Sequence, residues 1–284
     1  MNEYYIRLRS RLSPLYGERE ARAIAFLVFD EAFGVSRTDI YADKVRQFSQ
    51  DERLRFVNIC QRLAAGEPVQ YVLGHAEFCG HRFGVAPGVL IPRPETEELV
   101  AWAAKTITAC AAPCLKVLDA GTGSGCIAVS LKLQFPDCRV DAWDISSEAL
   151  QIAEANARRL QADVHFSRRD LLAPRSATDA AYDLIVSNPP YICERERTDM
   201  SPHVWRHEPH EALFVPDADP LRFYRALARA SVNGALRSGG TLMVEINSAY
   251  GPETVALFTA EGLRHVVLHR DTFGRDRVVE GKFL

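Results

Sequence analysis

From Leu115 to His269 the sequence alternates short apolar runs with longer amphipathic segments, and this alternation constrains the fold more than any other feature. Such alternation is typical of a mostly parallel β-sheet whose neighbouring strands are joined through helices on both faces. We predict strands at residues 116–120, 139–143, 163–166, 182–187, 241–246 and 264–269. We predict the intervening helices at residues 125–134, 146–160, 221–236 and 253–261. The tail from Gly274 to Phe283 can add an antiparallel edge strand, so the predicted fold class is α/β.

The first strand of this predicted sheet runs into a turn with three alternate glycines. The stretch reads Val117-Leu118-Asp119-Ala120-Gly121-Thr122-Gly123-Ser124-Gly125. Glycine lets the backbone turn sharply and lets a ligand approach without a Cβ in the way. Asp144 ends the next predicted strand, where a carboxylate can accept both hydroxyls of a ribose. The turn and the acid together predict a nucleoside-type ligand, and the alternative is a tight strand-to-helix turn that binds nothing.

The spacing of the glycines argues against two common nucleotide-binding motifs. A dinucleotide fold wants G-x-G-x-x-G, but here the third glycine comes one residue early and Cys126 stands in its place. The Gly-Lys-Ser/Thr of a phosphate-binding P-loop is absent from the sequence. After the third predicted strand, Asp170 could accept from an adenine amino group and Leu171 could pack on the ring.

A second motif, Asn188-Pro189-Pro190-Tyr191, follows the apolar strand at residues 182–187. The two prolines end that strand at the sheet edge where ligands bind in open α/β folds. A planar NH2 group needs two acceptors in its plane. The Asn188 side-chain oxygen can supply one and the Pro189 carbonyl the other, while Tyr191 offers an aromatic face. The tetrapeptide predicts a clamp for a neutral planar nitrogen, and a proline turn with an asparagine cap is the alternative.

The glycine turn resembles the S-adenosylmethionine loop of class I methyltransferases, and the clamp resembles that of amino-methyltransferases. The closest resemblance is to the protein-glutamine N5-methyltransferases, which modify the Gly-Gly-Gln loop of class 1 peptide chain release factors. It spans nearly the whole chain and rests also on Gly66–Tyr71, Ile91–Glu97, Glu208-Pro209 with Ala212-Leu213, and Phe273–Val278. Leu171 departs from the pattern, since some members carry an aromatic residue there.

The resemblance implies a Rossmann-like, seven-stranded, mostly parallel sheet and a specific set of site residues. S-adenosyl-L-methionine would be the cofactor and S-adenosyl-L-homocysteine the product. The clamp residues Asn188, Pro189, Pro190 and Tyr191 would hold the glutamine and carry the reaction. The cofactor would be bound by Asp119, Gly121, Thr122, Gly123, Ser124, Gly125, Asp144, Asp170, Leu171 and Asn188. No metal is expected. Arg93 and Glu208 could shape the substrate mouth or equally form surface ion pairs.

Three domain segments are predicted along the chain. Residues 1–70 are expected to form a helical substrate-recognition domain, residues 71–91 a β-hairpin linker, and residues 92–284 the methyltransferase domain. Apolar residues at three-to-four spacing support the helices of the first segment.

Composition limits the partners and the compartment. With a formal net charge of −3, the chain as a whole is not built to bind a polyanion. No apolar run has the length of a membrane span, and the amino terminus lacks the apolar core of a signal peptide. The seven cysteines match no disulfide framework or zinc pattern and indicate free thiols in a reducing cytosol. We therefore expect a cytoplasmic monomer whose partner is a release factor.

Other functions share parts of these motifs. Adenine-N6 nucleic-acid methyltransferases carry the same clamp but are expected to have a target-recognition region and a basic face. A related branch methylates a glutamine of a large-subunit ribosomal protein, and Pro92–Glu97 favours the release-factor branch. A non-catalytic partner-binding module is disfavoured because turn, acid and clamp are all intact.

Overall fold

The computed structural model describes residues 2–42, 48–110, 114–173 and 181–284. The chain divides into two compact units, which are described separately. The first unit comprises Met1–His75 together with Ser201–His207, and the second comprises Ala76–Met200 and Glu208–Leu284.

The first unit is helical, as the sequence predicts. It contains α1 (Glu3–Phe33), α2 (Arg37–Tyr41), α3 (Gln50–Ala64), α4 (Val69–Leu73) and, from the later segment, α8 (Pro202–Trp205). Serine capping boxes begin α2 and α3, each with an acidic residue three positions on that bonds back to the cap backbone. Phe29, Phe33, Phe48 and Phe56 pack together in a buried aromatic cluster that joins α1 to α3. This core stabilises the helical unit without any contribution from the sheet.

The predicted hairpin is shorter than residues 71–91. It consists of β1 (His75–Phe78) and β2 (His81–Gly84), whose turn places Cys79 and Gly80 at positive φ of 48° and 75°. Residues 69–73 form α4 instead of a strand, and residues 89–91 have no strand structure. Gly74 ends this helix in the left-handed conformation, with a φ of 82°.

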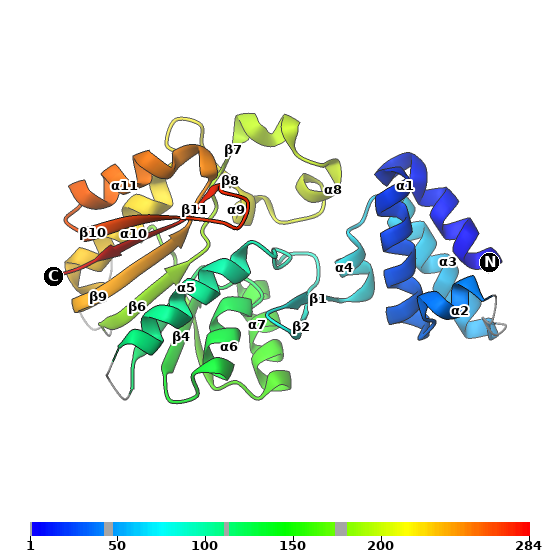
Figure 1. Ribbon diagram of the computed structural model, residues 1–284, viewed down its shortest axis with the longest axis horizontal. Coiled ribbons are helices and arrows are strands. Elements are labelled where there is room, and N and C mark those ends of the chain that lie inside the picture. Colours follow the sequence, from blue (N-terminus) through cyan, green and yellow to red (C-terminus); the bar gives the residue numbers. More distant parts are fainter. Residues whose placement is uncertain (1, 43–47, 111–113, 174–180) are drawn as a thin grey trace. The chain divides into compact units, whose positions relative to one another are not determined.

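Seven strands of the described chain form one sheet, in the order β10-β11-β9-β6-β3-β4-β5 (Figure 1). Their bounds are β3 (Lys116–Ala120), β4 (Arg139–Asp144), β5 (Val164–Arg168), β6 (Tyr182–Ser187), β9 (Leu236–Glu245), β10 (Arg264–Arg270) and β11 (Asp276–Lys282). The five strands from β9 to β5 are parallel, and β11 pairs antiparallel with both β9 and β10. The predicted strands are confirmed, as is the antiparallel pairing of the tail with the preceding strand. The tail is not an edge strand, however, because β11 lies between β9 and β10, and β10 forms the edge.

Helices cover both faces of this sheet (Figure 1). One face packs against α5 (Thr96–Ala109), α6 (Cys126–Gln134) and α7 (Ser147–Leu160), and the other against α10 (Arg222–Ala230) and α11 (Gly251–Ala260). Successive strand residues enter opposite cores because side chains alternate across a strand. Val117 and Met243 lie in the first core, whereas Leu118 and Leu242 lie in the second. Both cores hold the strand ends in fixed register.

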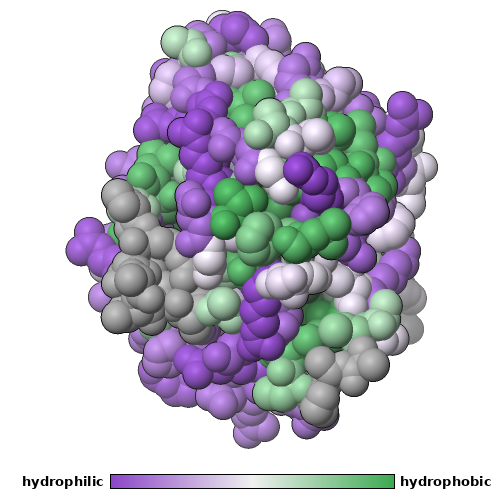
Figure 2. Space-filling view, turned by 90° about the vertical axis from the view of Figure 1, so that its left-hand side faces the viewer, coloured by the Kyte–Doolittle hydropathy of each residue, from purple (hydrophilic) through white to green (hydrophobic). Residues whose placement is uncertain are grey.

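The helix predicted to reach residue 236 ends earlier, at Ala230. A π-helical turn at Ser231–Ala235 follows it, in which Gly234 adopts a φ of 96°. On the face shown in Figure 2, hydrophobic residues gather near the middle with hydrophilic residues around them. In the described ranges, no helix is both long and apolar enough to cross a bilayer.

Between β6 and α10 the chain forms only short elements. They are β7 (Ile192–Cys193), η1 (Glu194–Asp199), α9 (His210–Leu213) and β8 (Phe214–Val215), besides α8. β7 and β8 pair in parallel as a small separate sheet. The stretch follows the carboxyl end of β6. The strand order reverses between β3 and β6, because the chain passes from β3 to β4 and β5 on one side and then returns to the other side of β3 with β6. Open α/β sheets bind ligands at such a point.

Candidate active site

A cavity of about 690 Å³ opens at the carboxyl ends of β3, β4 and β6. Of the residues predicted from the sequence, its wall contains Gly121, Thr122, Gly123, Ser124, Asp144, Asp170, Leu171, Asn188 and Pro190. Asp119, Gly125, Pro189 and Tyr191 lie outside this wall. The structure thus brings the turn, both loop acids and the clamp asparagine to one cavity within the second unit.

The glycine turn is fixed by its own backbone. The amides of Gly121 and Thr122 both donate to the Trp143 carbonyl at 2.8 Å. Gly121 and Gly123 have φ of 81° and 55°, in the region that favours glycine, and both face the cavity. Gly125, at φ 80°, serves packing: a Cβ there would lie 3.0 Å from the Cβ of Ala153 on α7. Gly121 and Gly123 thus line the cavity, whereas Gly125 allows α6 to pack closely against α7.

Asp119 lies under the turn and is fully buried. Its Oδ2 accepts from the Thr122 hydroxyl at 2.6 Å and from the Ala128 amide at 3.0 Å. Its Oδ1 is buried and has no hydrogen-bond partner within the described chain. Burial raises the pKa of Asp119 to about 7, although both hydrogen bonds oppose the shift. The carboxyl therefore links α6 to the turn. Because its pKa is near neutral, its ionisation can change with pH and with a bound ligand.

Asp144 ends β4 and lines the cavity. Its Oδ2 accepts from the Gly123 amide at 2.8 Å and its Oδ1 from the Ser146 amide at 2.9 Å. Burial raises the pKa of this carboxyl, and the backbone donors counter that shift. Each oxygen keeps a second lone pair, so the pair can accept two further hydrogen bonds from a ligand.

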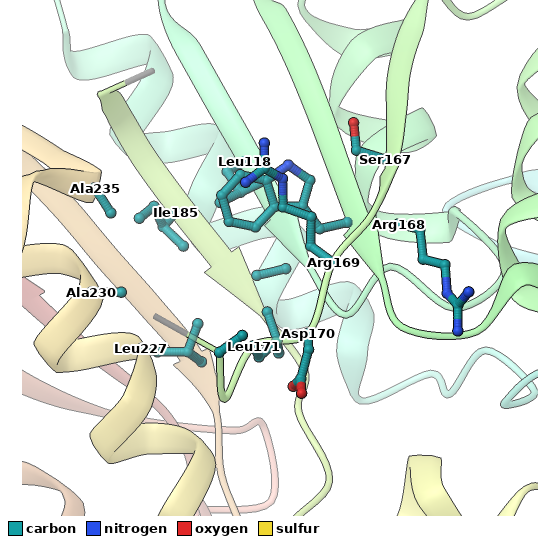
Figure 3. A pocket seen from close by; sticks show the side chains of 13 residues that line it. Leu118, Ser167, Arg168, Arg169, Asp170, Leu171, Ile185, Leu227, Ala230 and Ala235 are labelled. Atoms are coloured by element: carbon teal, nitrogen blue, oxygen red, sulfur yellow. The ribbon is translucent and has the colours of Figure 1, made fainter. Parts of the chain in front are cut away.

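Asp170 and Leu171 follow β5. The exposed Asp170 uses Oδ1 to accept from the Leu172 amide at 2.8 Å. Figure 3 shows that both residues also border a second cavity of about 430 Å³, where Leu118 and Ile185 of the sheet face Leu227 of α10. Leu171 therefore lines both the cavity of about 690 Å³ and the cavity of about 430 Å³.

Asn188 is the clamp residue that the structure orients most clearly. Its Nδ2 donates to the Thr96 Oγ1 at 3.0 Å. Within the part of the chain that the structure describes, neither Asn188 Oδ1 nor the Pro189 carbonyl accepts a hydrogen bond. The asparagine donor end is therefore engaged and its acceptor end is available. Thr96 is the first residue of α5, which begins without a side-chain cap, and its hydroxyl contacts Asn188.

Tyr191 is turned toward the protein interior. Its hydroxyl donates to Glu245 Oε1 at 3.1 Å, and the Asn247 amide donates to its carbonyl at 3.3 Å. Burial raises the pKa of the tyrosine, and the neighbouring Glu245 charge adds to the shift. Tyr191 is outside the cavity wall, and its hydroxyl contact with Glu245 fixes the side chain; the aromatic face predicted for the ligand stays a prediction.

Arg93 and Glu208 form one ion pair, with Arg93 Nη2 2.5 Å from Glu208 Oε1. Glu208 Oε2 also accepts from the Ile91 amide at 3.0 Å, and the Glu208 side chain is almost fully buried. This pair joins the segment before α5 to the loop after the clamp. Arg93 lines the cavity, as do Pro209, Ala212 and Phe214 of that loop. The pair is therefore a structural tie at the cavity rim and not a surface ion pair.

Sequence reasoning missed Glu245 and gave Thr96 no part in the site. A signal for Glu245 exists, because it is the one charged residue in the otherwise apolar run Leu242–Ile246. Ile145 and Val89 also line the cavity and carry no motif. Within the described residues, no group of histidines, cysteines or acids could hold a metal ion.

The sheet topology and the position of the cavity are those of the class I S-adenosylmethionine-dependent methyltransferase fold. Residues 105–207 match the family described as "Methyltransferase small domain". A methyltransferase structure from Pyrococcus furiosus superposes with a TM-score of 0.51 at 14% identity, covering 83% of this chain and all of that one. A similarity at that identity bears on the fold alone.

Sequence relatives narrow the class to one family. Residues 3–74 match the "PrmC N-terminal domain". A release factor glutamine methyltransferase of Bacteroides thetaiotaomicron is 46% identical over 98% of this chain and 99% of its own length. A release factor glutamine methyltransferase of Flavobacterium psychrophilum is 34% identical over 100% of this chain and 99% of its own length. The chain belongs to the release factor glutamine methyltransferase family.

Proposed function

We propose that this protein methylates the N5 amide nitrogen of the glutamine in the Gly-Gly-Gln motif of class 1 peptide chain release factors. The orientation of Asn188 carries the proposal: its Nδ2 is held by Thr96, which leaves Oδ1 to accept from a substrate NH2 group. The names of the full-length relatives support the substrate.

S-adenosyl-L-methionine fits the cavity residues as the cofactor. The Asp144 oxygens have lone pairs for two ribose hydroxyls, and Gly121 and Gly123 leave room for close approach. Asp170 would accept from the adenine amino group and Leu171 would pack on the ring. Asp119 is buried beneath the turn, and its ionised form would favour a cationic ligand.

The protein has to make a poor nucleophile reactive. An amide nitrogen has its lone pair delocalised into the carbonyl. S-adenosyl-L-methionine, when bound, would supply an electrophilic methyl on its sulfonium sulfur, so that the N–C bond would form as the S–C bond breaks and S-adenosyl-L-homocysteine would remain. Asn188 Oδ1 and the Pro189 carbonyl accept from the two N–H groups and favour the positive charge that develops on nitrogen. The surplus proton then leaves this nitrogen for water. Fixing the amide near the donor supplies much of the remaining acceleration.

Substrate recognition is assigned to the two peripheral parts of the chain. The helical residues 1–70 would recognise the release factor, and the loop tied by Arg93 and Glu208 would shape the mouth of the cavity. The protein would act as a monomer in the cytoplasm and bind no nucleic acid directly.

The test incubates the protein with labelled S-adenosylmethionine and, in parallel, a purified release factor, a large-subunit ribosomal protein and DNA. Mass spectrometry then locates any added methyl group. The expected result is a single methyl on the Gly-Gly-Gln glutamine of the release factor. Label on adenine, or only on the ribosomal protein, would contradict the proposal. The Asn188→Ala variant serves as the control for non-enzymatic transfer.

A further inference from the structure

The Pro189 carbonyl can serve as an acceptor only if the backbone of the clamp holds it in a fixed direction. Pro189 and Pro190 each have φ locked at about −65° by their rings. Asn188 and Pro189 each precede a proline, which restricts the backbone of both to extended conformations. The clamp is therefore a stiff segment, and the positions of its two ends decide where the Pro189 carbonyl points.

The first end of the clamp is fixed by the sheet. Ser187 is the last residue of β6 and pairs with Val244 of β9. It is fully buried, and its hydroxyl donates to the Ala120 carbonyl of β3 at 2.5 Å. Asn188 therefore starts from a point that neighbouring strands hold on both sides.

The second end is held by Asn247, which lies two residues beyond β9. Its Nδ2 donates to the Tyr191 carbonyl at 3.3 Å and to the two carboxylate oxygens of Glu196 at 3.0 and 3.2 Å. Its Oδ1 accepts from the Ala249 amide at 3.0 Å. An amide N–H can only donate, while carbonyl and carboxylate oxygens can only accept, so these partners allow the Asn247 side chain a single orientation.

Helix capping explains only one of these contacts. Asn247 precedes η3 (Ser248–Tyr250), and the hydrogen bond from Ala249 to Oδ1 is the cap of that short helix. A serine or an aspartate could supply the same oxygen. The bonds to Tyr191 and Glu196 need an NH2 group, and they connect the end of β9 to the clamp backbone and to η1. The donor end of Asn247 therefore has a task beyond the cap.

We propose that Asn247 is a positioning residue, which fixes the Tyr191 carbonyl and thereby the direction of the Pro189 carbonyl toward the substrate nitrogen. The inference rests on the proposed methyl transfer to a glutamine amide. Asn247 itself is outside the cavity wall and acts on the substrate through the clamp backbone. Glu196 accepts from the same nitrogen and so helps to hold it beside the clamp.

The decisive variant is Asn247→Asp, which keeps the shape and the cap oxygen but removes both donors. We expect kcat to fall by about tenfold to a hundredfold, because a small misplacement of a positioned group can cost about 10²-fold. Cofactor affinity and KM for the release factor should stay within about twofold, because the cavity wall is unchanged. Asn233→Asp is the matched control: it adds the same charge at an exposed position and should keep the parent kcat.

A charge swap separates positioning from general damage. In Asn247→Asp/Glu196→Gln the two residues exchange donor and acceptor at unchanged net charge. Their mutual hydrogen bond can form again, so the denaturant midpoint should recover, whereas the aspartate still has no proton for the Tyr191 carbonyl. At equal folded fraction, measured by circular dichroism, kcat should therefore stay low. Glu196→Gln alone keeps the Asn247 donor and should leave kcat near that of the parent.

Two results would overturn the inference: kcat of Asn247→Asp near that of the parent, or a swap variant whose kcat recovers together with its midpoint. If Asn247→Asp does not fold, Asn247→Ala decides by the same measurement, because it removes the donors without adding a charge. Failure of the proposed function looks different, because the parent protein would then not methylate the glutamine.

Discussion

The glycine turn and the clamp form two walls of one cavity, but they are held together in different ways. In the turn, Asp119 bonds to Thr122 and Ala128, and Asp144 to the Gly123 amide, over separations of 3, 9 and 21 residues. In the clamp, Asn188 bonds to Thr96 over 92 residues and Tyr191 to Glu245 over 54. One wall is built locally, mostly from backbone, and the other from side chains that only the folded sheet brings together.

This difference assigns separate tasks to the walls. A locally built turn can bind a cofactor whatever the remote side chains do, since its amides and φ values come from its own residues. The clamp needs a particular end of one amide group to face the substrate, and remote partners set that. We therefore expect damage to the turn to appear in cofactor affinity or stability, and damage to the clamp to appear in the rate of methyl transfer.

The largest effect is expected at the clamp. Asn188→Ala removes one of two preorganised acceptors and should lower kcat by ~10² or more, by analogy with losing one oxyanion-hole donor. Cofactor affinity measured by calorimetry should change little. Asn233→Ala, at an exposed asparagine after α10, is the control and should keep the parent rate. Near-normal turnover of Asn188→Ala would contradict the proposed role of the clamp in methyl transfer.

The second effect concerns the ribose wall. Asp144→Ala deletes the acceptor pair at the end of β4 and should weaken cofactor binding by about tenfold to a hundredfold, as expected for losing hydrogen bonds to a charged group. At saturating cofactor, kcat should recover to within a few-fold of the parent value. Titration calorimetry that finds unchanged affinity would show that the ribose lies elsewhere.

A third test separates the glycines. Gly125→Ala places a Cβ 3.0 Å from Ala153 at a φ of 80°, which should lower the free energy of unfolding by about 1–3 kcal/mol. Gly123→Ala meets nothing nearer than Val89 at 3.8 Å, so it should cost less stability and mainly weaken cofactor binding. Denaturant midpoints and affinities of both variants check this order, and an equal loss of stability in both would contradict it.

The smallest effect is a pH dependence set by Asp119. Because its folded-state pKa is raised from 3.8 to about 7, its contribution to stability is full below pH 3.8 and is lost as the pH rises through 7. A cationic ligand favours the ionised carboxyl, so cofactor affinity should rise a few-fold from pH 6 to pH 8 at about this pKa. In Asp119→Asn the rise should disappear. A parent profile that is flat over this range would show that Asp119 does not respond to the ligand.

The same contrast explains how far the sequence could be interpreted. Strand β4 and its terminal acid, the glycine turn and the antiparallel strand β11 all have local signals, so they could be predicted from hydrophobic alternation and glycine spacing. Thr96 and Glu245 have no local signal of partnership, because their contacts depend on the pairing of β6 with β9 and on the position of α5. Tyr191 shows the limit best: nothing in its motif indicated that its hydroxyl donates to a buried glutamate.

The measurement that tests the central claim most directly is a crystal structure of the protein with S-adenosyl-L-homocysteine and a peptide containing Gly-Gly-Gln. The account predicts that the glutamine N5 nitrogen lies within hydrogen-bonding distance of both Asn188 Oδ1 and the Pro189 carbonyl, with Asn188 Nδ2 still on Thr96. A glutamine bound elsewhere in the cavity, or an Asn188 that meets it through Nδ2, would contradict the account.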